Sequence, residues 1–222
     1  MSKMMFSKEI LTTLGEFILP QYTTLIIVDA QNDFCSPGGC FSQLKSSDME
    51  MTRSALERLA DLLAAARRAK LMIVYTQAVN LPSLIFKSSP DIARKFEYLN
   101  PDRPLICVEG EWGYQIVDEL KPLPDEIIIK KHRHSSFAGT ELDMLLRSNG
   151  IKTVIVTGFS TERCVLATVT GAIANDYYVV VPRDCIASPY VEMHNAALTV
   201  ISGNLCREEM TDSRQIISLW QR

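Results

Sequence analysis

The sequence predicts a soluble α/β protein of one domain, in which strands and helices alternate along the chain. Short apolar runs rich in β-branched residues recur, and segments with a helical spacing of apolar residues lie between them. The runs are nearly continuous in hydrophobicity, which is typical of strands covered on both faces. Strands and helices that alternate in this way favour parallel βαβ units and a three-layer sandwich.

Length and composition narrow the class of protein. The 222 residues, 47% hydrophobic and 22% charged, suit a single globular domain spanning residues 1–222. A formal charge of -3 makes nucleic acid an unexpected partner. No apolar run approaches the ~20 residues of a membrane helix. Because the N-terminus has no signal-peptide core, we expect a cytoplasmic protein. The six cysteines lack the spacing of a disulfide framework and are expected to be reduced and mostly buried.

The order of the elements follows from the apolar pattern. Strands are expected at residues 23–28, 71–75, 126–130, 152–157 and 177–181, and helices at 51–69, 162–176 and 191–201. A helix over 140–150 is expected to have Thr140 as its N-cap, with Asp143 three residues on, and to end at Gly150. A short sixth strand near Leu205 and a last helix over 212–220 complete the chain.

Residues 77–112 form the exception to this alternation. The segment contains four prolines, Pro82, Pro90, Pro101 and Pro104, and shows no sustained periodicity. A long irregular segment in a compact domain is usually functional. It is expected to act either as a lid over a site or as a surface for contacts between subunits.

Three chemically active residues directly follow predicted strands or enter the helix after one. Asp29 follows the first strand, Lys131 the third, and Cys164 enters the helix after the fourth. Ligands of open parallel sheets bind beyond the carboxyl ends of the strands, so an acid, an amine and a thiol are expected at one edge.

These residue types suit nucleophilic attack on a carbonyl carbon with an amine as the leaving group. A helix start and a cation both lower the pKa of a thiol, and a carboxylate can take its proton and return it to the leaving amine. Backbone N–H groups at the turn before Cys164 would face the oxyanion. Each residue also has a plainer interpretation, because Cys164 could be core packing and Asp29 could cap a loop. Strand alternation alone does not choose between Lys130 and Lys131.

Three motifs, in this order and spacing, carry a resemblance to a known family. The stretches "VDAQNDF", "KHRHSSFAGTELDMLLRSNGI" and "VTGFSTERCVLATVTGA" each lie at the end of a predicted strand. Together they resemble the isochorismatase-like cysteine hydrolases, over roughly residues 23–203. The resemblance implies a six-stranded parallel sheet with helices on both faces. It also implies a catalytic Asp–Lys–Cys triad that cleaves C–N bonds of amides and ureido compounds.

The resemblance assigns roles to individual positions. Asp29 matches the acid of the triad and Cys164 the nucleophile, and Lys131 rather than Lys130 matches the lysine. A cis peptide is implied at Phe159–Ser160, in the turn whose N–H groups, including that of Cys164, would form the oxyanion hole. Neither a metal nor an organic cofactor is implied, and a homo-oligomer, dimer or tetramer, is expected.

Departures from the family pattern narrow the expected substrate. The nicotinamidase branch has a metal-binding Asp-x-His set after its second strand, whereas "YTQAVNLPS" has neither a histidine nor an acid. The branch that cleaves isochorismate lacks the nucleophilic cysteine. The chain is therefore expected to resemble the carbamoyl and ureido amidohydrolases, a branch that includes N-carbamoylsarcosine amidase, ureidoacrylate amidohydrolase and the biuret and triuret hydrolases. A general carboxamide amidase and a catalytically silent binding scaffold are the alternatives.

Other residues are assigned to the surroundings of this site. Phe34 and Phe41, with Gln77 and Trp112 at the ends of the irregular segment, are expected to line the substrate pocket. Arg133 or Arg163 could bind a substrate carboxylate. His132 and His134 alternate on one strand, but no second cluster with ligand spacing accompanies them, so no metal site is expected. His134 stands where the family more often has an aromatic residue, which favours a structural or pocket-wall role.

The remaining histidine and cysteines are expected to be structural. His194 falls in a helical pattern and is interpreted as a hydrogen-bonded core or interface residue. Cys35 and Cys40 lie in a glycine-bearing loop, and Cys107, Cys185 and Cys206 are expected in the core.

Overall fold

A parallel sheet forms the middle layer of the computed structural model, which describes residues 3–44, 49–96, 105–206 and 209–221. Within these residues the sheet has seven strands, six of them in the order β5-β4-β3-β6-β7-β9, with β8 paired to β6. The strands are β3 (Thr23–Val28), β4 (Met72–Ala78), β5 (Ile127–Lys131), β6 (Thr153–Phe159), β7 (Tyr178–Pro182), β8 (Ile186–Ala187) and β9 (Met210–Thr211). Each of these pairings is parallel, as the alternating elements predict.

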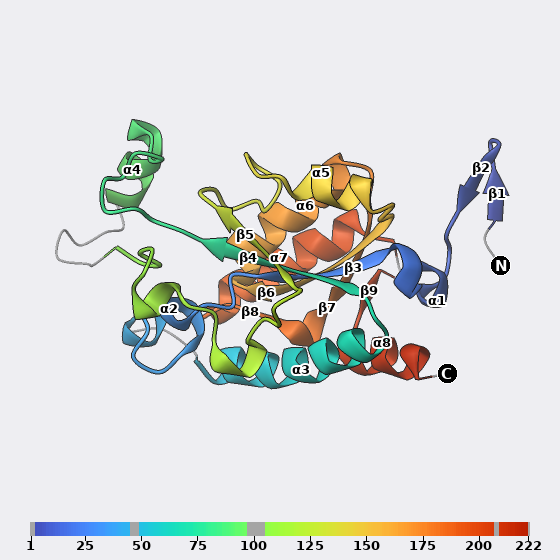
Figure 1. Ribbon diagram of the computed structural model, residues 1–222, viewed down its shortest axis with the longest axis horizontal. Coiled ribbons are helices and arrows are strands. Elements are labelled where there is room, and N and C mark those ends of the chain that lie inside the picture. Colours follow the sequence, from blue (N-terminus) through green and yellow to red (C-terminus); the bar gives the residue numbers. More distant parts are fainter. Residues whose placement is uncertain (1–2, 45–48, 97–104, 207–208, 222) are drawn as a thin grey trace.

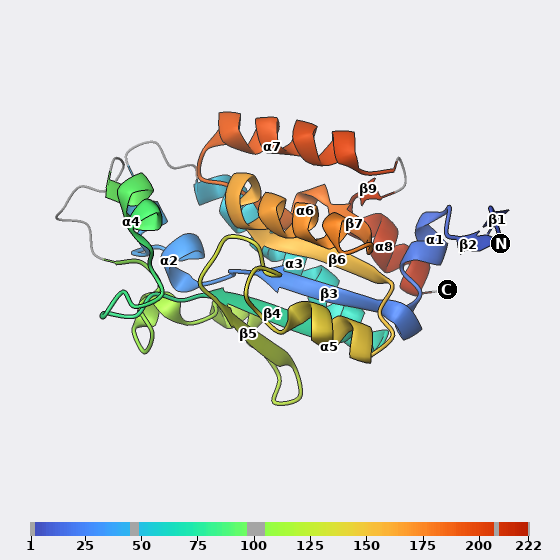
Figure 2. The same ribbon diagram turned by 90° about the horizontal axis from the view of Figure 1, so that it is seen from above.

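Helices cover both faces of the sheet, which confirms the predicted three-layer α/β class (Figures 1 and 2). One face carries α3 (Met49–Arg68) and α8 (Ser213–Trp220). The other carries α5 (Leu142–Ser148), α6 (Leu166–Ala174) and α7 (Val191–Asn204). Short helices α1 (Leu14–Phe17), α2 (Asn32–Cys35) and α4 (Ser89–Phe96) lie at the ends of the sheet. Single 3₁₀ turns occur at Pro20–Tyr22, Phe41–Gln43, Trp112–Tyr114, Asp118–Leu120 and Arg183–Cys185.

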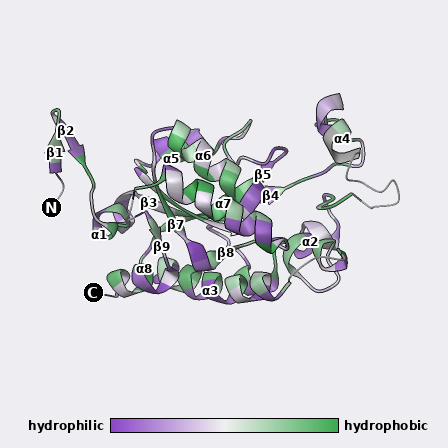
Figure 3. Cartoon of the chain, turned by 180° about the vertical axis from the view of Figure 1, so that it is seen from behind, coloured by the Kyte–Doolittle hydropathy of each residue, from purple (hydrophilic) through white to green (hydrophobic). Residues whose placement is uncertain are grey.

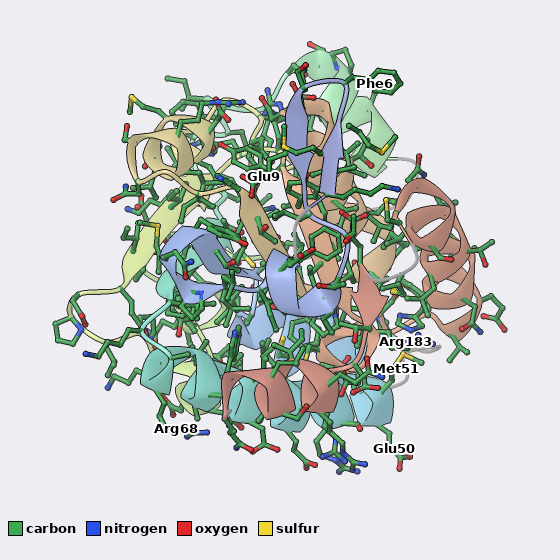
Figure 4. The ribbon with its side chains drawn as sticks, turned by 90° about the vertical axis from the view of Figure 1, so that its right-hand side faces the viewer. Phe6, Glu9, Glu50, Met51, Arg68 and Arg183 are labelled. Atoms are coloured by element: carbon green, nitrogen blue, oxygen red, sulfur yellow. The ribbon has the colours of Figure 1, made fainter. Side chains whose placement is uncertain are left out.

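Helix α3 shows how a helical spacing of apolar residues lets a helix pack against the sheet. Its buried apolar side chains recur every three or four residues, as in Leu56, Leu59 and Leu63, and so form one stripe against the sheet. The ribbon of α3 accordingly alternates between hydrophobic and hydrophilic colours (Figure 3). Glu50 and Arg68, at its two ends, are exposed and point away from the sheet (Figure 4).

The predicted sheet differs from the observed one in two short strands. Leu205 follows the last turn of α7, and the next strand among the described residues is β9, which begins five residues later at Met210. The implied six-stranded sheet also gains β8, whose two residues pair with Gly158 and Phe159. Two-residue strands carry no periodicity of their own, because their pairing is decided by the strand beside them.

Three elements at the N-terminus were not predicted. Strands β1 (Lys3–Met5) and β2 (Lys8–Ile10) form an antiparallel hairpin at the end of the molecule opposite α2 and α4 (Figures 1 and 2). Phe6 in its turn is 94% exposed and extends away from the body (Figure 4). Helix α1 follows, with Thr13 and Glu16 forming a capping box.

Helix boundaries were predicted to within a few residues, with two corrections. The N-cap of α5 is Glu141 rather than Thr140, whose hydroxyl instead accepts the N–H of Leu142 and donates to the Ser136 carbonyl. The helix expected over 162–176 begins as a π-helical turn at Thr161–Val165 and continues as α6. Turns of this kind often occur at functional sites.

The segment predicted to be irregular, 77–112, is more regular than its prolines indicate. Strand β4 continues through Ala78, and α4 occupies residues 89–96. Residues 97–104 lie outside the described part of the chain. Whether this segment is a lid or a subunit contact remains a prediction.

In the described residues, no helix is both long enough and apolar enough to span a bilayer.

The register of the parallel strands brings their carboxyl ends to one level. Val28 lies beside Thr76 on one side and Gly158 on the other, and Ala78 lies beside Lys131. Asp29 and Phe159 follow directly, so the predicted residues emerge at the same edge. Helices α2 and α4 lie at this end of the sheet (Figures 1 and 2).

Gly158 is required for this alignment, and its replacement should be costly. A Cβ built there would stand 2.0 Å from the carbonyl oxygen of Val28, and the residue has a φ of +111°. We predict that Gly158→Ala lowers the free energy of unfolding by about 3 kcal/mol, from backbone strain and overpacking. Urea denaturation followed by circular dichroism measures this. Gly203→Ala is the control, because nothing lies within 4 Å of its Cβ. Equal stabilities of the two variants would contradict the close-approach argument.

Candidate active site

Asp29, which directly follows β3, is the first residue of the site. Its φ is +50°, a left-handed conformation that aspartate tolerates better than most residues. The backbone N–H of Asp29 donates to the carbonyl of Thr76 at 2.9 Å, and its Oδ1 accepts the N–H of Ala78 at 3.0 Å. Its side chain is fully buried. Strand β4 therefore holds both the backbone and the carboxylate of Asp29.

Lys131, not Lys130, is the buried lysine. Strand β5 lies at the edge of the sheet, and its side chains alternate between a covered and an exposed face. Lys131 is 1% exposed, its Nζ lies 2.7 Å from Asp29 Oδ2, and it donates to the carbonyl of Arg133 at 3.1 Å. Lys130 points outward and pairs with Glu109. The expectation that every strand is covered on both faces is wrong for β5, because in the described part of the chain β5 is an edge strand with an exposed face.

Cys164 approaches Asp29 from the end of β6, which lies on the opposite side of β3 from β4 and β5. It lies in the π-helical turn after β6 and is buried, and its thiol interacts electrostatically with both Asp29 and Lys131. The three predicted residues are thus brought together from β3, β5 and the turn before α6.

The electrostatics of this cluster differ from the sequence-based expectation. Burial and the neighbouring Asp29 raise the pKa of the Cys164 thiol, and Lys131 offsets only part of that shift. Burial also raises the pKa of Asp29 against the opposing effect of Lys131. Although burial alone would lower it, the pKa of Lys131 is raised to about 12 by Asp29 and Cys164. The resting site therefore holds a protonated thiol beside an ion pair, rather than the preformed thiolate that the helix start and the cation predict.

His134 is a contact that sequence reasoning missed. Its Nδ1 lies 3.4 Å from the Sγ of Cys164, and its side chain is exposed, in contrast to Asp29 and Lys131. The sequence carried only a weak signal, a histidine in place of an aromatic residue in the motif. Its contact with the thiol depends on the path of the loop after β5.

A chain of hydroxyl groups fixes that loop against α6. Thr76 Oγ1 lies 3.1 Å from Ser136 Oγ, which lies 2.9 Å from Thr168 Oγ1. The N–H of Ser136 also donates to Thr168 Oγ1 at 3.1 Å. Because all three are buried, each hydroxyl needs a partner, and the chain joins β4, the loop and α6.

Two further residues of the first motif, Gln31 and Asp33, form hydrogen bonds that hold the loops next to the site. Gln31 accepts the N–H of Ala78 at 2.9 Å and donates to the carbonyls of Ala78 and Tyr114, at 3.0 and 2.8 Å. Asp33 accepts the N–H of Cys107 at 2.5 Å. These bonds tie the motif to the loops 105–116.

The turn before Cys164 has the expected cis peptide between Phe159 and Ser160. The carbonyl of Ser160 accepts the N–H groups of Arg163 and Val165, both at 3.2 Å. The amide of Cys164 lies between these two in the turn. Its role toward an oxyanion is a proposal taken up below.

The residues expected to line a pocket occupy different environments. Phe34 and Phe41 form an edge-to-face pair with ring centroids 4.9 Å apart. Gln77 is 6% exposed and donates to the Tyr114 carbonyl at 3.1 Å, so its amide supports a loop. Trp112 is 49% exposed, and its carbonyl accepts a bond from Asn32. Their contact with substrate stays a prediction.

The expected arginines and histidines also find partners. Arg133 is exposed and donates to the carbonyls of Phe86 and His132, both at 2.9 Å, while Nε of exposed Arg163 lies 3.6 Å from Glu162. The His132 ring stacks on Phe86 at 3.9 Å. His194 is buried and its Nδ1 lies 2.9 Å from Thr161 Oγ1, which confirms a hydrogen-bonded core residue.

The cysteines form neither disulfides nor a metal site in the described part of the chain. All six lie in the described ranges, and none of them is in a disulfide. Cys206 is exposed, so its prediction as a core residue is wrong, because it lies two residues after the end of α7 rather than on a buried face. Over residues 3–44, 49–96, 105–206 and 209–221, no group of three histidines, cysteines or acids has a geometry that would hold a metal ion.

Comparison with known proteins places this fold and site in a family. The isochorismatase domain matches residues 23–215. An isochorismatase-like hydrolase from Alkaliphilus metalliredigens is 30% identical, with 90% of this chain and 99% of that chain covered and a TM-score of 0.71. A pyrazinamidase from Pyrococcus horikoshii, solved with zinc, is 26% identical over 86% and 97%, with a TM-score of 0.67. An N-carbamoylsarcosine amidase from Thermoplasma acidophilum, 24% identical over 86% and 96% with a TM-score of 0.66, shares the fold.

The chain belongs to the isochorismatase family and is a hydrolase of that family. This confirms the resemblance carried by the three sequence motifs.

The two neighbouring lysines offer a matched test of the buried ion pair. Lys131→Met leaves the carboxylate of Asp29 buried without its cation, and we predict a loss of about 3–5 kcal/mol in the free energy of unfolding. Lys130→Met removes only an exposed pair and should change it by about 0–1 kcal/mol. Urea denaturation of both variants provides the measurement. A smaller loss for Lys131→Met than for Lys130→Met would contradict the geometry.

The raised thiol pKa gives a prediction with a definite sign. Alkylation follows the thiolate, whose fraction rises with pH through the thiol pKa. Since Asp29 raises that pKa, Asp29→Asn should move the Cys164 alkylation curve to lower pH. At a pH below both midpoints, the labelling rate should rise about tenfold for every pH unit by which the midpoint falls. Iodoacetamide labelling of the Cys164 peptide by mass spectrometry measures it on folded protein, with Asp143→Asn as the surface control. A curve displaced to higher pH would refute this assignment.

Proposed function

We propose that this protein is a cysteine-dependent amidohydrolase that cleaves a C–N bond of a small carbamoyl or ureido compound and releases ammonia. One observation carries the proposal: Asp29 and Lys131 form a buried ion pair, and both lie close enough to the thiol of Cys164 to shift its pKa. An acid, a cation and a nucleophile in mutual contact are what attack on an unactivated amide carbonyl requires.

In the first half of the reaction Asp29 accepts the thiol proton as Sγ attacks the carbonyl carbon. The raised pKa of Asp29 suits this role, because a carboxylate buried in this way is a stronger base than an exposed one. Lys131 keeps a positive charge beside the forming thiolate, since its pKa is raised to about 12. The protonated Asp29 then returns the proton to the departing nitrogen, and a thioester remains on Cys164.

Charge that develops on the carbonyl oxygen needs donors at the turn before Cys164. We assign this role to the backbone N–H groups of the Phe159–Ser160 turn, that of Cys164 among them. Fixed backbone donors at the site of a developing oxyanion lower the barrier to acyl transfer by about 3–4 kcal/mol in comparable enzymes.

Two features favour carbamoyl and ureido substrates over nicotinamide. The stretch after the second strand, "YTQAVNLPS", has no histidine or acid, unlike the metal-binding set of the nicotinamidase branch. Over the described ranges, side chains with metal-holding geometry are also absent. The fold itself does not discriminate, because an N-carbamoylsarcosine amidase and a nicotinamidase both share it. Phe34, Phe41, Gln77 and Trp112 are proposed to bound the pocket, and a general carboxamide amidase is the second candidate, because the triad itself does not discriminate.

The partner, the location and the oligomeric state of the protein are proposed from the same reasoning. With a formal charge of -3 and no organic cofactor invoked in any step, the proposed partner is the small substrate alone. A cytoplasmic homo-oligomer, dimer or tetramer, is proposed, with the segment 77–112 as its lid or its contact.

Ammonia release from ureido, carbamoyl and simple carboxamide compounds tests the proposal, with wild type run beside Cys164→Ala. We expect turnover of at least one ureido or carbamoyl compound and a loss of at least about 10³-fold in the variant, because the nucleophile is removed. Cys206→Ala, which removes an exposed thiol outside the site, is the control and should match wild type.

The other outcomes are also informative. Ammonia from carboxamides alone would move the function to a general amidase. No release from any compound, together with unlabelled Cys164 at high pH, would leave the binding scaffold as the function.

A further inference from the structure

The thiol of Cys164 has two kinds of neighbour. Asp29 and Lys131 are 0% and 1% exposed, and both affect the thiol electrostatically. The Nδ1 of His134 lies 3.4 Å from Sγ, on a side chain that is exposed. One thiol therefore interacts with a buried ion pair and also with a titratable ring that reaches solvent.

The second half of the proposed reaction needs a proton acceptor on the solvent side. Water must lose a proton as it attacks the thioester, and the departing sulfur must gain one. Asp29 is fully buried, and its oxygens contact interior groups, Oδ1 the Ala78 N–H and Oδ2 the Lys131 ammonium. His134 is exposed, so water that comes from bulk solvent is expected to meet His134 before it meets Asp29.

Contacts of the neighbouring residues on both sides fix the position of His134. Lys131 Nζ binds the Arg133 carbonyl at 3.1 Å immediately before it. Two residues after it, Ser136 is held by Thr76 and Thr168 through the buried hydroxyl chain. Backbone anchored on both sides presents the imidazole to Sγ with little freedom, as a proton-transfer group requires.

We propose that His134 is a catalytic base in hydrolysis of the thioester, so that Asp29 serves the first half-reaction and His134 the second. Nδ1 of the neutral ring accepts a proton from water as the water oxygen bonds to the carbonyl carbon. The C–S bond then breaks with its electron pair passing to Sγ, and the same Nδ1 returns the proton to the sulfur. Acid product leaves, and both the thiol and the neutral imidazole are restored. This inference rests on the proposed amidohydrolase function.

The test separates the two half-reactions, using the best substrate of the panel. His134→Phe keeps a ring but removes the base. We expect its first turnover to release one leaving group per active site at a rate within about threefold of wild type. Its steady-state rate should fall about hundredfold, the lower end for a general base. Intact-protein mass spectrometry should then show an acyl adduct on Cys164 that wild type does not accumulate.

A second variant guards against a merely structural effect. His134→Ala should likewise accumulate the adduct, and added imidazole should restore its steady-state rate at least tenfold. The control is His132→Gln, which changes a histidine that stacks on Phe86 rather than contacting Sγ, and it should stay within about threefold of wild type in both phases.

The remaining outcomes overturn the inference in distinguishable ways. If first turnover and steady state fall together in both His134 variants, without an adduct or imidazole rescue, His134 acts before the thioester or only structurally. A steady-state rate within threefold of wild type also overturns it. If wild type shows no turnover that depends on Cys164, the proposed function fails first and the inference fails with it.

Discussion

The buried ion pair between Asp29 and Lys131 is the constraint on which the rest of the site depends. Moving two charges out of water costs several kcal/mol each, and only good geometry with further hydrogen bonds offsets it. The pair meets this condition, with a 2.7 Å contact, the Ala78 N–H on one partner and the Arg133 carbonyl on the other. Since these groups come from three adjacent strands, the register of the sheet must be kept for the pair to exist.

The chemistry of the site follows from the effect of this ion pair on the thiol of Cys164. A buried thiol beside a carboxylate resists ionisation, so the pKa of Cys164 is raised although a cation is close. Burial also raises the pKa of Asp29, which makes its carboxylate a stronger base than an exposed one. Under the proposed function, the thiolate would form only when a substrate binds, and Cys164 would stay protonated at rest. Exposed His134 is then the group in contact with Sγ that can exchange protons with solvent.

Much of this site could be predicted because parallel strands align their carboxyl ends. That rule placed Asp29, Lys131 and Cys164 together from chain order alone, and the motifs chose Lys131 where alternation could not. The direction of the Cys164 pKa shift was mispredicted, because helix position and charge are local whereas burial is a property of the packed fold. The burial of Cys206 was mispredicted for the same reason.

The sequence by itself determined the α/β class, the order of the main strands and helices, the meeting of Asp29, Lys131 and Cys164, and the cis turn, because each depends on local pattern or on motifs with fixed spacing. Tertiary structure alone decided the two-residue strands β8 and β9, the exposed face of β5, the hydroxyl chain through Ser136 and the contact of His134 with Cys164. These features join residues about 30 or more apart in the chain or depend on which strand lies at the edge. No local pattern encodes such distances, so only the packed sheet and its helices could settle them.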